Sequence, residues 1–200
     1  MSGAFASKLE EMDACREAVQ WVGDRDLSTA WAECERPDWM FWLAGRMAGK
    51  AGWSDLNEII LVAADIAESV LQLTREQARE VCQKAIQSAR DLVKGLIDRD
   101  AAADAAAAAN AVADVAYLAA CVTTRGSVAA YAAAAVYAAR AAACVVAAAR
   151  AAVYTAADVA DEAAAVADAA AYAAGCTADA AAKRAEICRL IRERIVVGTV

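Results

Sequence analysis

Few side chains in this 200-residue chain are of the types that carry out catalysis. The chain contains no histidine, the commonest general base and a common metal ligand, so neither a Ser–His nor a Cys–His pair can form. A Ser–Lys pair is possible in principle, but no spacing marks one. No Walker sequence and no G-x-G-x-x-G motif is present to hold nucleotide phosphates. The composition therefore predicts a protein that is not an enzyme and that needs no cofactor.

Cysteines and paired acids are the remaining candidates for metal or redox chemistry. No two cysteines have the C-x-x-C spacing of a zinc or redox site, so we expect reduced thiols that occupy apolar core positions. Adjacent acids such as Asp161 and Glu162 are expected to lie on solvated helix faces, and we predict no metal site. The seven cysteines are Cys15, Cys34, Cys82, Cys121, Cys144, Cys176 and Cys188.

The charge balance narrows the choice of partners. A net charge of −7 argues against nucleic acid, which requires clustered lysine and arginine, and it suits a basic protein. The longest run without a charged residue, from Gly126 to Ala139, is shorter than the roughly 18 apolar residues that a membrane span needs. The first residues lack the basic-then-apolar order of a signal peptide. We therefore expect a cytoplasmic protein that does not bind membranes.

The chain divides by composition near residue 100. Residues 1–100 contain all five tryptophans and 15 alanines, whereas residues 101–200 contain all five tyrosines and 46 alanines. Alanine is the best helix former, and small side chains let helix axes approach closely. The pattern predicts an all-α fold, an antiparallel multi-helix bundle or stack. Within this fold we expect one continuous domain with two parts. The first is a tryptophan-containing helical subdomain over 1–100, and the second is a long alanine-rich helical subdomain over 101–200.

Capping residues and apolar spacing predict the individual helices. Ser28 is expected to cap a short second helix that Pro37 ends, and Asp55 to open a helix with a wide apolar stripe. Thr74 and Gln77 form a predicted capping box before a helix whose inward face reaches Leu96. The other expected helices cover 8–22, 39–47, 101–124, 127–173 (one helix or two, with a break at 154–156) and 177–195.

Tryptophan clustering is the strongest local feature of the first half. Trp39, Trp42 and Arg46 share one face of their predicted helix, and Arg46 can stack over Trp42 as a cation–π pair. Such residues either anchor the core of the N-terminal subdomain or form a binding hot spot, because Trp and Arg are enriched in hot spots.

Isolated charges interrupt the alanine-rich half. Asp168 is one of them, and Arg125, Arg140 and Arg150 are others. We expect them at solvent edges or in ion pairs between helices. Alternatively, the three arginines and the tyrosines could bind a signalling nucleotide.

The segment from Ala30 to Arg46 reads AWAECERPDWMFWLAGR. It resembles the C-x-x-x-D-W-M-x-W-L signature of an immunity protein family described as "immunity protein five"-like, whose members occur in bacteria and some phages. Family members continue into a long alanine-rich tract and end in a charged helix, as Lys183 to Arg194 does here. The resemblance implies a role associated with polymorphic toxins, and it carries no catalytic residues.

These observations together predict a binding protein that neutralises a toxin or a defence effector by stoichiometric contact. An acidic surface would meet basic groups on that partner. Two alternatives are a phage-type sponge that sequesters a signalling nucleotide in an oligomer and a structural protein that assembles into homo-oligomers. The expected partner-binding residues are Glu33, Glu35, Arg36, Asp38, Trp42 and Arg46.

Overall fold

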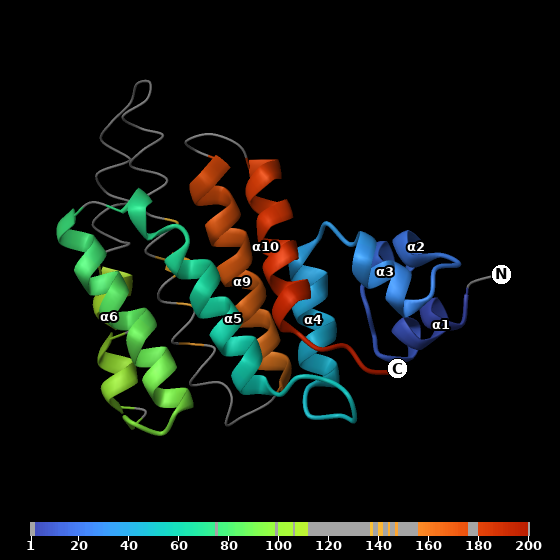
Figure 1. Ribbon diagram of the computed structural model, residues 1–200, viewed down its shortest axis with the longest axis horizontal. Coiled ribbons are helices and arrows are strands. Elements are labelled where there is room, and N and C mark those ends of the chain that lie inside the picture. The colour runs from blue at the N-terminus through green and yellow to red at the C-terminus, as the bar shows by residue number, and fades with distance from the viewer. Residues whose placement is uncertain are drawn as a thin grey trace.

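The computed structural model describes residues 3–74, 76–98, 100–105, 107–111, 137, 140, 141, 144, 147, 156–175 and 180–199. Every regular element within these residues is a helix, and the helices pack side by side into a layered stack (Figure 1). The predicted all-α fold is confirmed.

The first three helices form a small group at the N-terminal end of the molecule (Figure 1). They are α1 (Ala4–Glu11), α2 (Arg16–Val22) and α3 (Leu27–Glu33). The single helix predicted over 8–22 is wrong, because Asp13 adopts a left-handed conformation with φ of 61° and separates α1 from α2. The predicted cap of α3 is wrong as well. Asp26, and not Ser28, accepts a hydrogen bond from the Thr29 amide at 2.7 Å.

Two apolar helices follow, and both begin close to the predicted residues. Helix α4 (Pro37–Met47) starts with proline at its first position, where the missing N–H costs nothing. Helix α5 (Leu56–Glu68) is capped by Asp55, whose carboxylate accepts from the Glu58 amide at 3.0 Å, as predicted. The apolar stripe of α5 is almost entirely buried, which confirms its inward orientation.

A 3-10 turn, η1 (Leu71–Leu73), leads into α6 (Glu76–Val93). The side chain of Gln77 lies outside the described residues, so the predicted capping box stays a prediction. The prediction that Leu96 faces inward is wrong, because this residue is 69% exposed. The helix ends at Val93, and the turn at Gly95 takes Leu96 off the buried face.

Helices α9 (Ala156–Gly175) and α10 (Ala180–Arg194) come from the alanine-rich half. Residues 101–105, 107–111, 137, 140, 141, 144 and 147 are also helical. The remaining parts of the helices predicted over 101–124 and 127–173, including the possible break at 154–156, lie outside the described residues.

Helix α9 is the centre of the stack. It packs against α4, α5 and α10, so residues from both compositional halves share one core (Figure 1). Small side chains form its contact face, since Ala163, Ala167, Ala170 and Ala173 are fully buried. The larger core side chains come from its neighbours, among them Phe41 of α4. Alanine on one helix against bulky residues on the next allows close axial approach without leaving voids.

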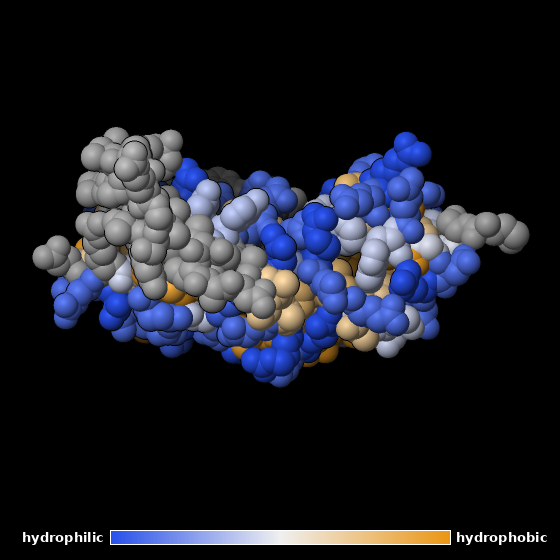
Figure 2. Space-filling model, turned by 90° about the horizontal axis from the view of Figure 1, so that it is seen from above, coloured by the Kyte–Doolittle hydropathy of each residue, from blue (hydrophilic) through white to orange (hydrophobic). Residues whose placement is uncertain are grey.

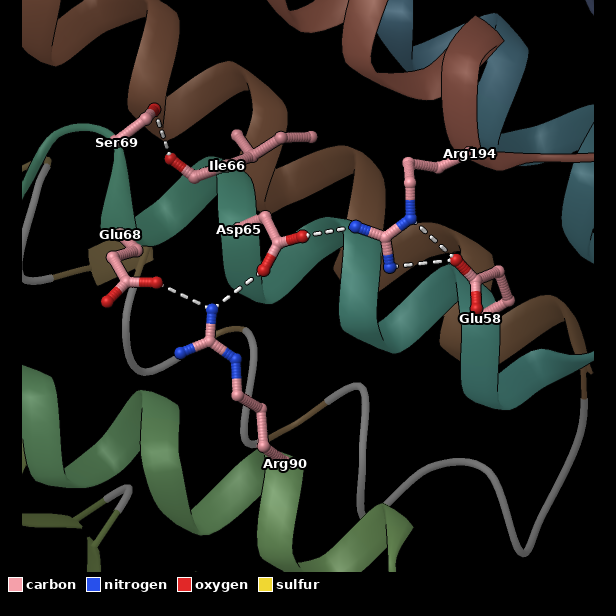
Figure 3. A network of polar contacts seen from close by, with 7 residues as sticks. All are labelled: Glu58, Asp65, Ile66, Glu68, Ser69, Arg90 and Arg194. Carbon is pink, nitrogen blue, oxygen red and sulfur yellow. Dashed lines mark hydrogen bonds and ion pairs between the residues drawn. The ribbon is translucent and has the colours of Figure 1, made fainter.

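Two arginines tie α5 to the helices on either side of it (Figure 3). Arg90 of α6 contacts Asp65 at 2.7 Å and Glu68 at 2.6 Å. Arg194 of α10 contacts Asp65 at 2.6 Å and Glu58 at 2.9 Å. Because Asp65 accepts from both arginines, the five side chains form one network that fixes how the three helices pack. Networks of this kind stabilise more than isolated surface pairs do.

The cysteines differ in exposure. Cys34, Cys82 and Cys188 are buried free thiols, as predicted, whereas Cys144 is half-buried and Cys15 is exposed, contrary to the expectation of a core position. Cys121 and Cys176 lie outside the described residues.

Burial also sets how reactive these thiols are, because the thiolate is the reactive form. Burial raises the pKa of Cys82 to about 11 and that of Cys188 to about 12. At neutral pH we expect a thiol reagent to modify Cys15 rapidly, and Cys82 and Cys188 only after unfolding. Mass spectrometry of peptides from native and urea-treated protein measures this difference. Equal labelling of Cys15 and Cys82 in the native protein would contradict the buried positions.

Candidate partner-binding groove

An open groove with a volume of about 760 Å³ lies between the N-terminal helices and the bundle. It opens where α4 begins, α9 ends and α10 begins, the end of the stack at the top of Figure 1. Figure 2 views the molecule from this end, and hydrophilic residues cover much of the face. We call it the acidic groove. Its polar and aromatic lining residues are Glu17, Trp21, Glu33, Glu35, Arg36, Asp38, Trp39, Asp168, Tyr172 and Arg184.

The lining is strongly acidic. Five carboxylates face two guanidiniums, a formal net charge of −3 within one groove. The carboxylates come from α2, the α3–α4 segment and α9, so only the folded chain brings them together. A concave surface of one charge sign concentrates ligands of the opposite sign and speeds their encounter. The acidic groove therefore favours a cationic ligand.

Arg36 is the most heavily paired residue of the groove. Its Nε and Nη2 donate to the two carboxylate oxygens of Asp38 at 3.0 and 2.8 Å, and Nη1 lies 3.4 Å from Glu17. The guanidinium also lies over the ring of Trp39, 4.5 Å from its centroid. The hydrogen bonds that Arg36 donates to Asp38 raise the pKa of Arg36 still further above its usual range, so this side chain stays charged.

Two carboxylates of the groove have no ion pair within the described part of the chain. Glu35 is exposed beside Arg36, and Asp168 reaches in from α9. Partial burial and the nearby charge of Asp38 raise the pKa of the Asp168 carboxyl, whereas Arg36 and Arg184 act in the opposite direction. Asp168 therefore has an electrostatic environment that a further cation would relieve.

Aromatic rings provide the other part of the lining. Tyr172 of α9 is 56% exposed and stacks on Tyr137, with ring centroids 5.3 Å apart and planes at 24°. Trp21 and Trp39 pack against each other at 5.9 Å. An exposed aromatic face beside carboxylates binds cations by cation–π attraction as well as by charge.

A single arginine of α10 holds the α3 side of the groove in place. The guanidinium of Arg192 donates to the backbone carbonyls of Trp31, at 3.0 Å, and of Cys34. These carbonyls lie at the C-terminal end of α3, where the helix dipole favours a cation. Arg192 thus positions the segment that carries Glu33 and Glu35.

The structure divides the six predicted partner-binding residues into two sets. Glu33, Glu35, Arg36 and Asp38 line the acidic groove. Trp42 instead faces a small apolar cavity of about 50 Å³ that Trp21, Trp31 and Trp39 also line. The side chain of Arg46 stacks over Trp42 at 5.5 Å, which confirms the predicted cation–π pair, but neither residue lines the groove.

Five polar or aromatic groove residues were not predicted to bind a partner: Glu17, Trp21, Asp168, Tyr172 and Arg184. For Asp168 the signal was its isolation among alanines, which marks a position that faces away from the core. Nothing in the sequence places it beside Asp38.

Of the three arginines proposed to bind a signalling nucleotide, one lies within the described residues. Arg140 is helical and exposed, and Arg125 and Arg150 lie outside the described residues. Among the residues that the structure places, no three acids or cysteines gather in a way that could hold a metal ion. No helix in the same part of the chain is long and apolar enough to cross a membrane.

Fold and groove together define an all-helical protein with an acidic groove that is lined in part by aromatic rings. Comparison with known proteins finds no matching family model, no matching curated protein and no matching solved structure.

Proposed function

We propose that this protein is a non-enzymatic binding protein of the immunity type. It neutralises a toxin or defence effector by stoichiometric contact, and it takes a basic surface of that partner into the acidic groove. The observation that carries the proposal is the net charge of −3 on the groove lining, together with two carboxylates, Glu35 and Asp168, that have no ion pair within the described residues.

The location of the groove supports the same function. The segment that resembles the immunity protein signature, Cys34 to Leu43, supplies Glu35, Arg36, Asp38 and Trp39 to the lining. Complementary charge across an interface chiefly raises the association rate and excludes acidic proteins. Both properties suit a protein that must capture a damaging partner quickly.

The test compares two variants that carry the same change in charge. In the double variant Glu35→Gln and Asp168→Asn, the groove loses two carboxylates that make no ion pair to the described residues, so the fold should persist. We expect the partner's affinity to fall by roughly tenfold or more, mainly through a slower association rate that depends strongly on salt.

The partner itself is obtained by cross-linking to the wild-type protein in the source cell, with the neighbouring genes expressed, and its binding is then measured by biolayer interferometry. The control, Glu10→Gln with Asp24→Asn, removes two exposed carboxylates outside the groove. Capture of a basic protein at one-to-one stoichiometry that only the groove variant loses supports the proposal. A partner that binds both variants as tightly as the wild type would overturn it.

A further inference from the structure

The acidic groove already contains a guanidinium group, the side chain of Arg36. Asp38 holds the guanidinium of Arg36 through both oxygens, Glu17 approaches it at 3.4 Å from α2, and Trp39 covers its face at 4.5 Å. Two carboxylates and an aromatic plane thus surround one guanidinium, contributed by two different helices. This part of the groove therefore accommodates a guanidinium group.

The geometry distinguishes a guanidinium from an ammonium group. A planar guanidinium can pair with both oxygens of one carboxylate and stack on an indole ring at the same time, whereas an ammonium group acts as a single point charge. The Arg36 side chain nevertheless remains 44% exposed. Exposed ion pairs of this kind contribute little net free energy, because the separated groups are well solvated. The guanidinium is therefore held in a defined position but can be displaced.

We propose that Arg36 is an internal stand-in for an arginine of the partner. On binding, an arginine side chain of the partner displaces Arg36 from Asp38, Glu17 and Trp39, and the same geometry makes the groove prefer arginine to lysine. This inference rests on the proposed function, since it names the group by which a basic partner enters the acidic groove. Asp168 lines the same groove and its charge already acts on Arg36, so it can stabilise the guanidinium after its displacement.

An internal occupant has a functional consequence. A ligand that must displace it binds with an apparent affinity reduced by the fraction of molecules in which the site is free. An isolated arginine side chain then competes poorly, while a partner that brings several contacts in addition to its arginine still binds. Arg36 thus raises the selectivity of the groove.

The experiment uses two short probe peptides, alternating glycine with arginine or glycine with lysine, and isothermal titration calorimetry with the full chain. Arg36→Lys is the decisive variant, because it keeps the charge of the groove and replaces only the planar guanidinium with an ammonium group. We expect it to bind the arginine peptide roughly tenfold more tightly than the wild type does. The affinity for the lysine peptide should change little, because an ammonium group binds through the overall charge of the groove and does not need the position between Asp38 and Trp39. Arg36→Ala should tighten both peptides, because it also removes a positive charge.

Arg46→Ala is the matched control, since Arg46 also stacks on a tryptophan but lies outside the groove. It should leave both affinities unchanged. If Arg36→Lys binds the two peptides with equal affinity, the inference is overturned. The proposed function survives that result as long as the Glu35→Gln and Asp168→Asn double variant weakens both peptides. If that variant binds as the wild type does, or if no variant binds either peptide, both proposals fail. The helical signal of each variant in far-ultraviolet circular dichroism establishes that the variant is folded.

Discussion

Replacing Ala167 with leucine should lower the free energy of unfolding by about 3 kcal/mol, one of the largest effects expected for any single substitution in this protein. Ala167 is fully buried in α9, the helix that packs against α4, α5 and α10 at once. A leucine there must displace a neighbouring helix, because the close packing of the stack leaves no room for a longer side chain. Because α9 packs against three helices, we expect a cost at the upper end of the range for overpacked cores.

Urea denaturation followed by circular dichroism at equilibrium measures the change. The control is Ala182→Leu, at an exposed alanine of α10, which should alter the free energy of unfolding by less than about 0.5 kcal/mol. Equal effects of the two substitutions would show that the buried face of α9 has space to spare and that alanine is there for helix propensity alone.

Helices with an uneven distribution of polar and apolar residues could be predicted from the sequence. Helix α5 is the clearest case, because Asp55 caps its first turn and isoleucine recurs at helical spacing. The break between α1 and α2 could not be predicted. It depends on a left-handed Asp13, and neither glycine nor proline stands at that position to indicate a turn.

The site was predictable only where its residues are neighbours in sequence. Glu33, Glu35 and Asp38 lie with Arg36 in one short segment, so the shared negative charge of the three acids and the adjacent tryptophan indicated a binding surface. Helix α9 offers no comparable pattern. A helix made almost entirely of alanine has little contrast between its faces, so periodicity cannot indicate which face packs on α4. The contribution of Asp168 and Tyr172 to the groove follows from that packing alone.

Arg192 should be the second position with a large effect, and it should alter stability and binding together. In Arg192→Gln, the carbonyls of Trp31 and Cys34 lose their charged donor, because the glutamine side chain is shorter and neutral. We expect the free energy of unfolding to fall by about 2 kcal/mol, typical of hydrogen bonds to a charged group. Since these bonds fix the end of α3, partner binding through Glu33 and Glu35 should weaken even at temperatures where the variant remains folded.

The variant Arg189→Gln is the control for Arg192→Gln. It distinguishes the positioning of the end of α3 from the effect of losing one positive charge on α10. Arg189 lies one helical turn away, and its only ion pair in the described part of the chain is with Glu193, at 2.6 Å on the exposed surface. Its loss should cost about 0.5 kcal/mol or less and leave binding unchanged. Thermal unfolding and partner titration of both variants test the comparison. If Arg189→Gln weakened binding as much as Arg192→Gln does, long-range charge and not the position of α3 would control the groove. The dependence of affinity on salt would then be altered in both variants, whereas loss of positioning alone leaves that dependence as it is in the wild type.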